Sequence, residues 1–335
     1  HPDVIFYGEG WTMSTNVTKE GYTMATQLNS QQTPGFAYFN DTIRDGLKGS
    51  VFDDTDPGFA SGKPGMEETL SRCFLGADAW CASPSQTVNY ASCHDNLTLF
   101  DHLQTARPEA GREDLVRMNN LAAAFYMMAE GVPFLQAGEE MLRTKVNDDG
   151  SFNSNSYNAN DQVNCLKWGD LDDEAYRQVF EYYKGLIAFR KAHGALRLGT
   201  AQEVSDAVSV VSGLDANVIA FDIKGGVNGE TAEEMYLIFN ANETSATVSL
   251  PEGNWNVYIN AEQAGTQALA SIDGGSAVVE PVSAMVLVKE DAAAAPSTQD
   301  GGAQESTGLA AGLAVAAVLA CGSGAFAVLN KKRKA

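Results

Sequence analysis

Val4-Ile5-Phe6-Tyr7-Gly8-Glu9-Gly10-Trp11 is the stretch of sequence that decides the fold. Its apolar first half is typical of a buried strand, and the carboxylate of Glu9 follows where that strand ends. A second apolar run, 88–90, is followed within a few residues by His94-Asp95-Asn96. Parallel strands collect the side chains at their C-terminal ends on one face of an α/β barrel. We therefore expect Glu9 and Asp95 to meet on that face.

Residues 1–195 alternate short apolar runs with helical patterns, which predicts βα units around a parallel sheet. Apolar residues at three- and four-residue spacing predict helices from Asp114 to Glu130 and from Glu174 to His193. These apolar stripes are interpreted as core faces. The expected strands lie at 4–7, 35–39, 87–91 and 133–137.

Residues 196–290 have a different pattern, with short β-branched and aromatic runs separated by turn formers and no helical period. This pattern predicts a small antiparallel β-sandwich. The expected strands lie at 208–211, 218–221, 235–239, 246–250, 255–259 and 284–288.

The C-terminal part of the chain predicts a membrane anchor. A linker rich in Ala, Ser and Gly is expected at 291–307, and the anchor at 308–335. The run from Leu309 to Leu329 has no charge, and at ~1.5 Å per residue it can cross a ~30 Å hydrocarbon core as a single transmembrane helix. Basic residues at 331–334 place its C-terminus in the cytoplasm. A buried helix is the alternative.

Charge and cysteine content exclude several classes of protein. The net charge of −21 makes nucleic-acid binding very unfavourable. Five cysteines without a CxxC pair argue against a structural zinc site. We expect free thiols, with a Cys73–Cys81 disulfide as the alternative in an oxidising compartment. Calcium could be suggested by Asp53, Asp54 and Asp56, but no calcium motif supports it, so a solvated turn is expected and no cofactor is required.

Seven motifs follow one another along residues 1–290. They are Tyr7–Trp11, Phe39-Asn40-Asp41, Arg44 to Gly49, 89–96, Pro133 to Gly138, Ser156-Tyr157-Asn158 with Asp161, and 281–287. In this order they resemble the motifs of bacterial type I pullulanases of the α-amylase superfamily. This resemblance implies a starch- or glycogen-debranching glycoside hydrolase acting on α-1,6-glucosidic bonds.

The family works by retention, in which one carboxyl group protonates the leaving oxygen and a second, about 5–5.5 Å away, attacks the sugar. Glu9 resembles the general acid/base, and burial beside Trp11 and Tyr7 would help to keep it protonated. Asp95 resembles the acid that stabilises the transition state, with His94 as its partner. The alternatives are a turn glutamate bonded to backbone amides and a surface His–Asp pair.

The resemblance also implies a substrate-binding set. A tyrosine can stack on a sugar face, while Asn and Asp side chains bond its hydroxyls. The implied residues are Trp11, Tyr7, Asn96, Tyr157, Asn158 and Asp161. This chain has Ala159-Asn160 where the family usually has Ser-Pro, which puts the rigidity of that loop in doubt.

The family's nucleophilic aspartate ends the strand before the Glu9 motif, and this chain has no place for it. Asp3 begins the first strand, at its wrong end. We therefore expect a truncated chain with strands five to eight of the barrel, unpaired sheet edges and no activity of its own. The alternatives are a non-catalytic glucan-binding surface protein and a glycosidase acting on α-1,4 bonds.

Thr307-Gly308 resembles the end of the sortase signal of Gram-positive bacteria, although the usual Leu-Pro is absent. Together with the apolar run, it predicts an extracellular protein at the cell surface, held by the membrane rather than by covalent wall attachment. The expected partners are thus an α-glucan and the membrane.

Overall fold

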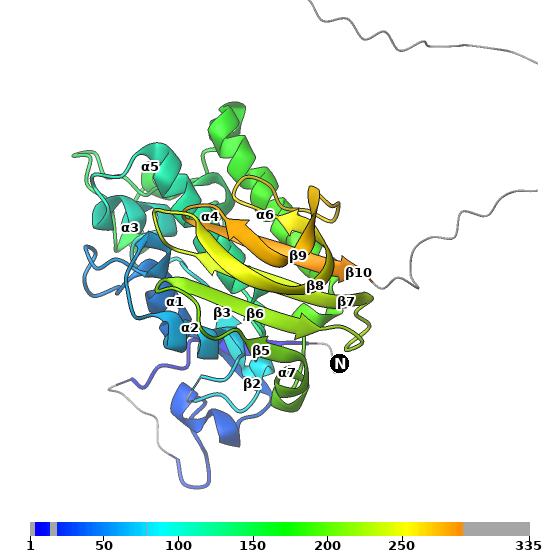
Figure 1. Cartoon of the computed structure of the whole chain (residues 1–335). Helices are drawn as coiled ribbons and strands as arrows, with labels where there is room; N and C mark the ends of the chain where they lie inside the picture. The colour runs from blue at the N-terminus through cyan, green and yellow to red at the C-terminus, as the bar shows by residue number, and fades with distance from the viewer. Residues whose placement is uncertain (1–3, 14–18, 79, 291–335) are drawn as a thin grey trace, which may run out of the picture. The chain divides into compact units, whose positions relative to one another are not determined.

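The computed structural model describes residues 4–13, 19–78 and 80–290 (Figure 1). These residues belong to one compact unit, His1–Ala295. The expected linker at 291–307 and the expected anchor at 308–335 lie outside the described residues. Among the residues described, no helix has the length and apolar character needed to span a membrane.

The first part of the described chain contains a parallel sheet, as expected from the alternating pattern. Its strands pair in the order β1-β2-β3-β4, and every pairing is parallel. Their bounds are β1 Phe6–Gly8, β2 Phe36–Phe39, β3 Thr87–Asn89 and β4 Val132–Pro133. The helices are α1 Asp41–Lys48, α2 Glu67–Phe74, α3 Leu99–Ala106, α4 Arg112–Met128, α5 Asp161–Asn164, α6 Glu174–Ala192 and α7 Ala201–Ala207.

β1 is an exposed edge strand, which corrects the expectation that it is buried. The side chains of residues 4–7 are 52–59% exposed. In the described chain β1 pairs only with β2, so one edge and much of its surface have no neighbour. Unpaired edges of the parallel sheet were expected, and both β1 and β4 have one in the described chain.

The second part forms an antiparallel sheet in the order β5-β6-β7-β10-β8-β9. Its strands hydrogen-bond into one continuous sheet, whereas a sandwich of two sheets was expected. β8 explains the difference: its start pairs only with β9, and after a bulge between Leu250 and Asn254 its end pairs with β10 as well. The bounds are β5 Val208–Val210, β6 Val218–Lys224, β7 Ala232–Asn240, β8 Ala246–Ile259, β9 Ala270–Val279 and β10 Ser283–Glu290.

The two faces of this antiparallel sheet bury different clusters. The start of β8 packs with Val218, Ala220 and Trp255 on one face. On the other face, Phe221 and Phe239 join the cluster that contains the helices of the first part. The phenylalanine rings of Phe74 and Phe221 stack with centroids 3.7 Å apart.

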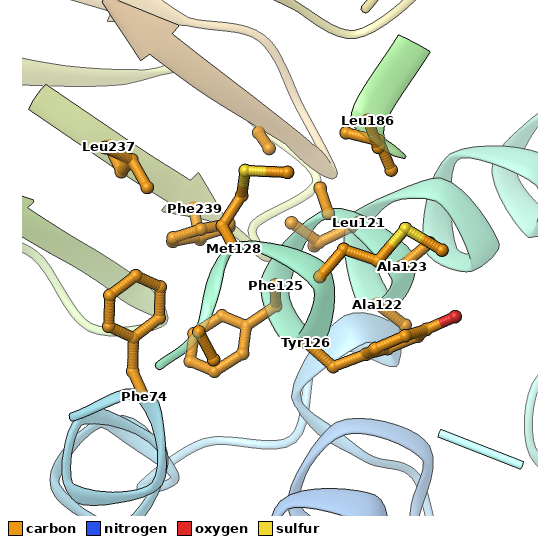
Figure 2. Packing of buried hydrophobic residues seen from close by; sticks show 14 of the residues in the cluster. Phe74, Leu121, Ala122, Ala123, Phe125, Tyr126, Met128, Leu186, Leu237 and Phe239 are labelled. Atoms are coloured by element: carbon orange, nitrogen blue, oxygen red, sulfur yellow. The ribbon is translucent and has the colours of Figure 1, made fainter. Parts of the chain in front are cut away.

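α4 lies at the centre of the larger cluster (Figure 2). Phe125 on α4 contacts Phe74 of α2 and Phe239 of β7, with ring centroids 5.6 and 4.8 Å apart. Figure 2 shows Leu186 of α6 on the same cluster. The boundary expected near residue 195 therefore separates two types of secondary structure, while the hydrophobic core crosses it. The cysteines at 73, 81, 93 and 165 are free thiols, as expected.

Candidate active site

Glu9 is carried by the turn that follows β1. Gly10 has φ +73, and a Cβ at this position would lie 2.4 Å from the ring of Tyr38. Only glycine fits such a left-handed turn against an aromatic side chain. The carbonyl of Gly10 accepts a hydrogen bond from the Gln27 amide at 2.9 Å. The sequence Gly-Glu-Gly thus lets the chain turn sharply while it projects the carboxylate.

The loop that follows β3 carries His94 and Asp95 to the same place. Side-chain ligand atoms of Glu9, His94 and Asp95 all lie within 4.8 Å of one another. His94 Nε2 lies 3.5 Å from Asp95 Oδ1. The expectation that strand ends bring Glu9 and Asp95 together is confirmed, and His94 lies beside them. They line a cleft of about 480 Å³ with Tyr7, Trp11, Phe39, Asp41, Arg44, Val51, Phe52, Tyr90, Cys93, Asn96 and Phe134.

The Glu9 carboxylate is exposed to solvent, which corrects the expectation that its neighbours bury it. Tyr7 is itself 54% exposed and Trp11 is only half-buried. The reason is the edge position of β1, because no described element covers that side of the strand. Within the described chain, the side chains beside Glu9 do not enclose it.

Four aromatic side chains that line the cleft contact one another. The ring of Phe39 contacts those of Tyr7, Tyr90 and Phe134, with centroids 5.9, 5.0 and 4.9 Å apart. At the rim, Phe52 is 94% exposed. Aromatic surface next to carboxylates is suited to a sugar ring, which has apolar faces and hydroxyl edges.

Arg44 adds a positive charge that sequence reasoning did not assign to the site. Its Nη1 donates to the Tyr90 hydroxyl at 3.0 Å, and its Nε donates to Asp45 Oδ1 at 2.6 Å. Burial opposes the charge, but the hydrogen bonds and electrostatic attraction of Asp45 and Tyr90 together outweigh it and raise the pKa of Arg44 above its usual range. Arg44 lies in a motif quoted above, yet its role depends on contact with Tyr90, which sequence spacing does not reveal.

Tyr157, Asn158 and Asp161 lie outside this cleft, and their role in substrate binding stays a prediction. All three are exposed, Tyr157 by 80%, and none of them lines the cleft. They lie in the 3-10 turn Ser156–Asn158 and at the start of α5. Asn160 caps α5 by accepting a hydrogen bond from the Val163 amide at 3.2 Å. Of the expected binding residues, the structure gathers Trp11, Tyr7 and Asn96.

The acidic residues at 53–56 are engaged by protein donors. Asp53 Oδ1 accepts hydrogen bonds from the amide and hydroxyl of Thr55, and Asp56 accepts two from Lys63 Nζ at 2.8 Å. These contacts are those of a local turn, which was the expected alternative to calcium. Glu9, His94 and Asp95 could contact one cation, but exposed acidic groups are common without one.

Comparisons with known proteins agree with the motifs. The family description "Pullulanase, all-beta domain" matches residues 205–263. The pullulanase of Bacillus subtilis strain 168 is 31% identical over 256 residues, which cover 75% of this chain and 34% of the relative. The chain thus spans about a third of that relative's length.

Solved structures show the same partial coverage. A pullulanase from Bacillus acidopullulyticus has a TM-score of 0.79 and 35% identity, over 86% of this chain and 34% of the other. A pullulanase from Paenibacillus barengoltzii in complex with maltohexaose and α-cyclodextrin has a TM-score of 0.76 and 33% identity, over 87% and 44%.

Proposed function

Because this chain corresponds to part of a pullulanase, we propose that it carries part of a glycosidase site that hydrolyses α-1,6-glucosidic bonds in pullulan, starch or glycogen. The observation that carries this proposal is the convergence of Glu9, His94 and Asp95 in one aromatic-lined cleft. Retaining cleavage needs an acid, a nucleophile and groups that stabilise positive charge on the sugar.

The cleft residues divide these tasks as follows. Glu9 protonates the leaving glycosidic oxygen and later accepts a proton from the attacking water. Asp95, with His94 beside it, binds sugar hydroxyls and stabilises the oxocarbenium-like transition state. Tyr7, Trp11 and Asn96 contact the sugar. A cleft that excludes water would favour the protonated form of Glu9. Because Glu9 is exposed in the described chain, we propose that residues outside the described chain shield it from solvent.

We place the nucleophile outside the described chain. Among the described residues, Asp41 is the third carboxylate of the cleft, but it accepts a hydrogen bond from Gln27 Nε2 at 3.1 Å and starts α1. Asp3 lies outside the described residues. We propose that this chain alone is catalytically incomplete and that a preceding βα segment supplies the missing carboxylate.

The test compares pullulan hydrolysis by this chain with that by a longer protein including the encoded upstream segment. Activity is expected only in the longer form. Glu9→Gln should lower its kcat/KM by about 10²- to 10⁴-fold because proton transfer is lost. Glu181→Gln, at an exposed position on α6, is the matched control. Hydrolysis by this chain alone would contradict its incompleteness.

A second measurement separates the enzyme from a binding protein. Maltotriose binding by calorimetry is expected for this chain, and Tyr7→Ala should weaken it. Tyr157→Ala should leave binding unchanged, because Tyr157 is exposed and does not line the cleft. Binding without hydrolysis in the longer form would favour the glucan-binding alternative. Preference for amylose over pullulan would favour α-1,4 cleavage.

We also propose that the protein is held at the cell surface of a Gram-positive-type bacterium. The support is the uncharged run from Leu309 to Leu329 and the basic cluster after it. Removal of residues 308–335 should release the protein from the membrane fraction into the medium. Retention of the shortened protein by membranes would contradict this location.

A further inference from the structure

The loop from Tyr90 to Thr98, which carries His94 and Asp95, lies on a set of buried polar side chains. Tyr90 is held by Arg44, as described above. Ser92 donates a 2.5 Å hydrogen bond to Glu139 Oε2, and Glu139 Oε1 accepts from the hydroxyls of Tyr126 and Tyr183 at 2.7 and 3.1 Å. Thr98 ends the loop by capping α3. Two further hydrogen bonds, to the backbone carbonyls of residues 94 and 97, come from lysines.

Lys145 contacts the start of residues 94–97, the part of the loop that carries His94 and Asp95. Its Nζ donates to the carbonyl oxygen of His94 at 2.8 Å, and the residue is only 2% exposed. Its own backbone amide donates to Asp101 Oδ2 at 2.8 Å, and Asp101 is fully buried on α3. Lys145 therefore connects the loop to the helix that follows it.

Lys48 holds the end of the same segment. It is the last residue of α1, it is 1% exposed, and its Nζ donates to the carbonyl oxygen of Leu97 at 3.2 Å. Between the two carbonyls lies Asn96, whose φ of +61 is rare for a residue other than glycine. The two lysines thus hydrogen-bond to the backbone on both sides of Asn96, which has a left-handed conformation. The side chains of residues 94–96 line the cleft.

Burying an ammonium group costs desolvation free energy. Within the described chain, neither lysine forms an ion pair with a carboxylate, and the hydrogen-bond acceptor of each ammonium group is a backbone carbonyl. Burial lowers the pKa of both lysines, to about 8 for Lys48. Apolar side chains of similar volume are often neutral or stabilising at such positions. We therefore looked to the loop that they contact for a function other than stability.

We propose that Lys48 and Lys145 are positioning residues that fix the 94–97 backbone, and hence the Asp95 carboxylate opposite Glu9. The inference rests on the proposed function, because it assigns these lysines to the same glucan site. A strong donor on each flanking carbonyl prevents the loop from relaxing out of the left-handed turn. Asp95 then meets the substrate without first being ordered, which strengthens binding.

The experiment measures two properties of the full chain in Lys48→Met and Lys145→Met. The first is deuterium uptake of residues 90–98, corrected for global stability; the second is maltotriose affinity by calorimetry. Methionine keeps the length of the side chain and removes its charge and donors. We expect faster exchange confined to 90–98 and a weakening of maltotriose binding by roughly tenfold or more.

Three further variants make the test specific. Lys184→Met removes an exposed lysine on α6 and should change neither property. Val248→Ala makes a cavity in the buried cluster of the antiparallel sheet, so it lowers global stability without touching the loop. It shows how much exchange at 90–98 rises from lower stability alone. If a methionine variant does not fold, the corresponding glutamine variant, which keeps an N–H donor, replaces it and should show a smaller effect.

The outcomes separate this inference from the proposed function. Unchanged exchange at 90–98 in both variants, or a rise no greater than in Val248→Ala, would overturn the positioning role. Faster exchange with unchanged maltotriose affinity would also overturn it, since the fixed loop would then have no effect on the site. If the wild-type chain binds no maltotriose, the proposed function is wrong, and exchange alone decides whether the lysines fix the loop.

Discussion

Glu130 is a buried carboxyl group outside the candidate site. It follows α4, its Oε2 accepts a hydrogen bond from the Leu198 amide at 2.8 Å, and its Oε1 has no hydrogen-bond partner in the described structure. Burial raises the pKa of Glu130 to about 8, against the opposing effects of that hydrogen bond and the nearby Arg190. The group is therefore protonated in the folded protein at neutral pH.

This shift predicts a pH-dependent stability. The unfolded state ionises Glu130 near its ordinary pKa, so the folded state holds the extra proton and loses stability as pH rises toward 8. Relative to Glu130→Gln, the wild-type free energy of unfolding should fall by on the order of 3 kcal/mol between pH 5 and pH 8. Denaturant titrations at the two pH values measure it. A constant difference between the two proteins would mean that Glu130 stays ionised when folded.

At the residue scale, the sequence located the cleft groups because they belong to contiguous motifs at strand ends. Glu9, His94 and Asp95 were all predicted and lie together. Lys48 and Lys145 were not predicted, since a lysine buried against a backbone carbonyl has the same sequence signal as an exposed one. The exposure of Glu9 depends on which elements pack against β1, and the local sequence around Glu9 does not predict those neighbours.

α6 packs closely against the turn that follows β8. A Cβ on Gly185, in the middle of this helix, would lie 2.0 Å from the carbonyl oxygen of Ala264. Glycine lowers intrinsic helix stability by about 1 kcal/mol relative to alanine. At this position, it permits a contact between helix and backbone that any larger residue prevents.

Gly185→Ala should therefore destabilise the protein despite its better helix propensity. Forcing the helix away from Ala264 is expected to cost about 1–3 kcal/mol, as for other overpacked sites. Thermal and urea unfolding measure the change, with Lys184→Ala, at the neighbouring exposed position, as control. An increase in stability would show that the contact relaxes without cost.

At the element scale, the sequence predicted the long helices well and the short ones poorly. The pattern from Asp114 to Glu130 corresponds to α4 Arg112–Met128, and that from Glu174 to His193 to α6 Glu174–Ala192. α1, α2, α3 and α7 were not predicted, since seven or eight residues give too few turns for a periodic signal. β9 was missed as well, because Asp273-Gly274-Gly275 interrupts its apolar pattern.

β1 forms an apolar edge that no other described element covers. Residues 4–7 are all more than half exposed, and Phe36 on β2 continues the surface. An exposed apolar edge strand has unpaired backbone donors and acceptors, and it favours association with other chains. In a longer protein, a neighbouring strand would occupy this edge.

The isolated chain is therefore expected to self-associate through β1. Ile5→Lys should shift it toward the monomer at micromolar concentration, because a charge on the edge opposes strand pairing. Sedimentation velocity measures the change, and Leu28→Lys, at another exposed apolar position, is the control. Equal association of wild type and Ile5→Lys would place the contact elsewhere.

At the scale of the whole molecule, the sequence predicted a parallel part followed by an antiparallel part, and both are present. It did not predict that the antiparallel strands form one sheet, since Pro251-Glu252-Gly253 is typical of a turn between two strands, whereas the structure has a bulge there within the single strand β8. Nor did it predict the shared core, because the contact of Phe125 with Phe239 joins residues more than a hundred positions apart.

That shared core has a consequence for how such proteins can be recombined. An antiparallel sheet at the end of a chain suggests an exchangeable module, to be joined to another catalytic part at a convenient linker. Here Phe221 and Phe239 complete the packing of α2 and α4. A chimera cut near residue 195 would expose two mismatched halves of one interior, so the smallest transferable piece includes the helices together with the sheet.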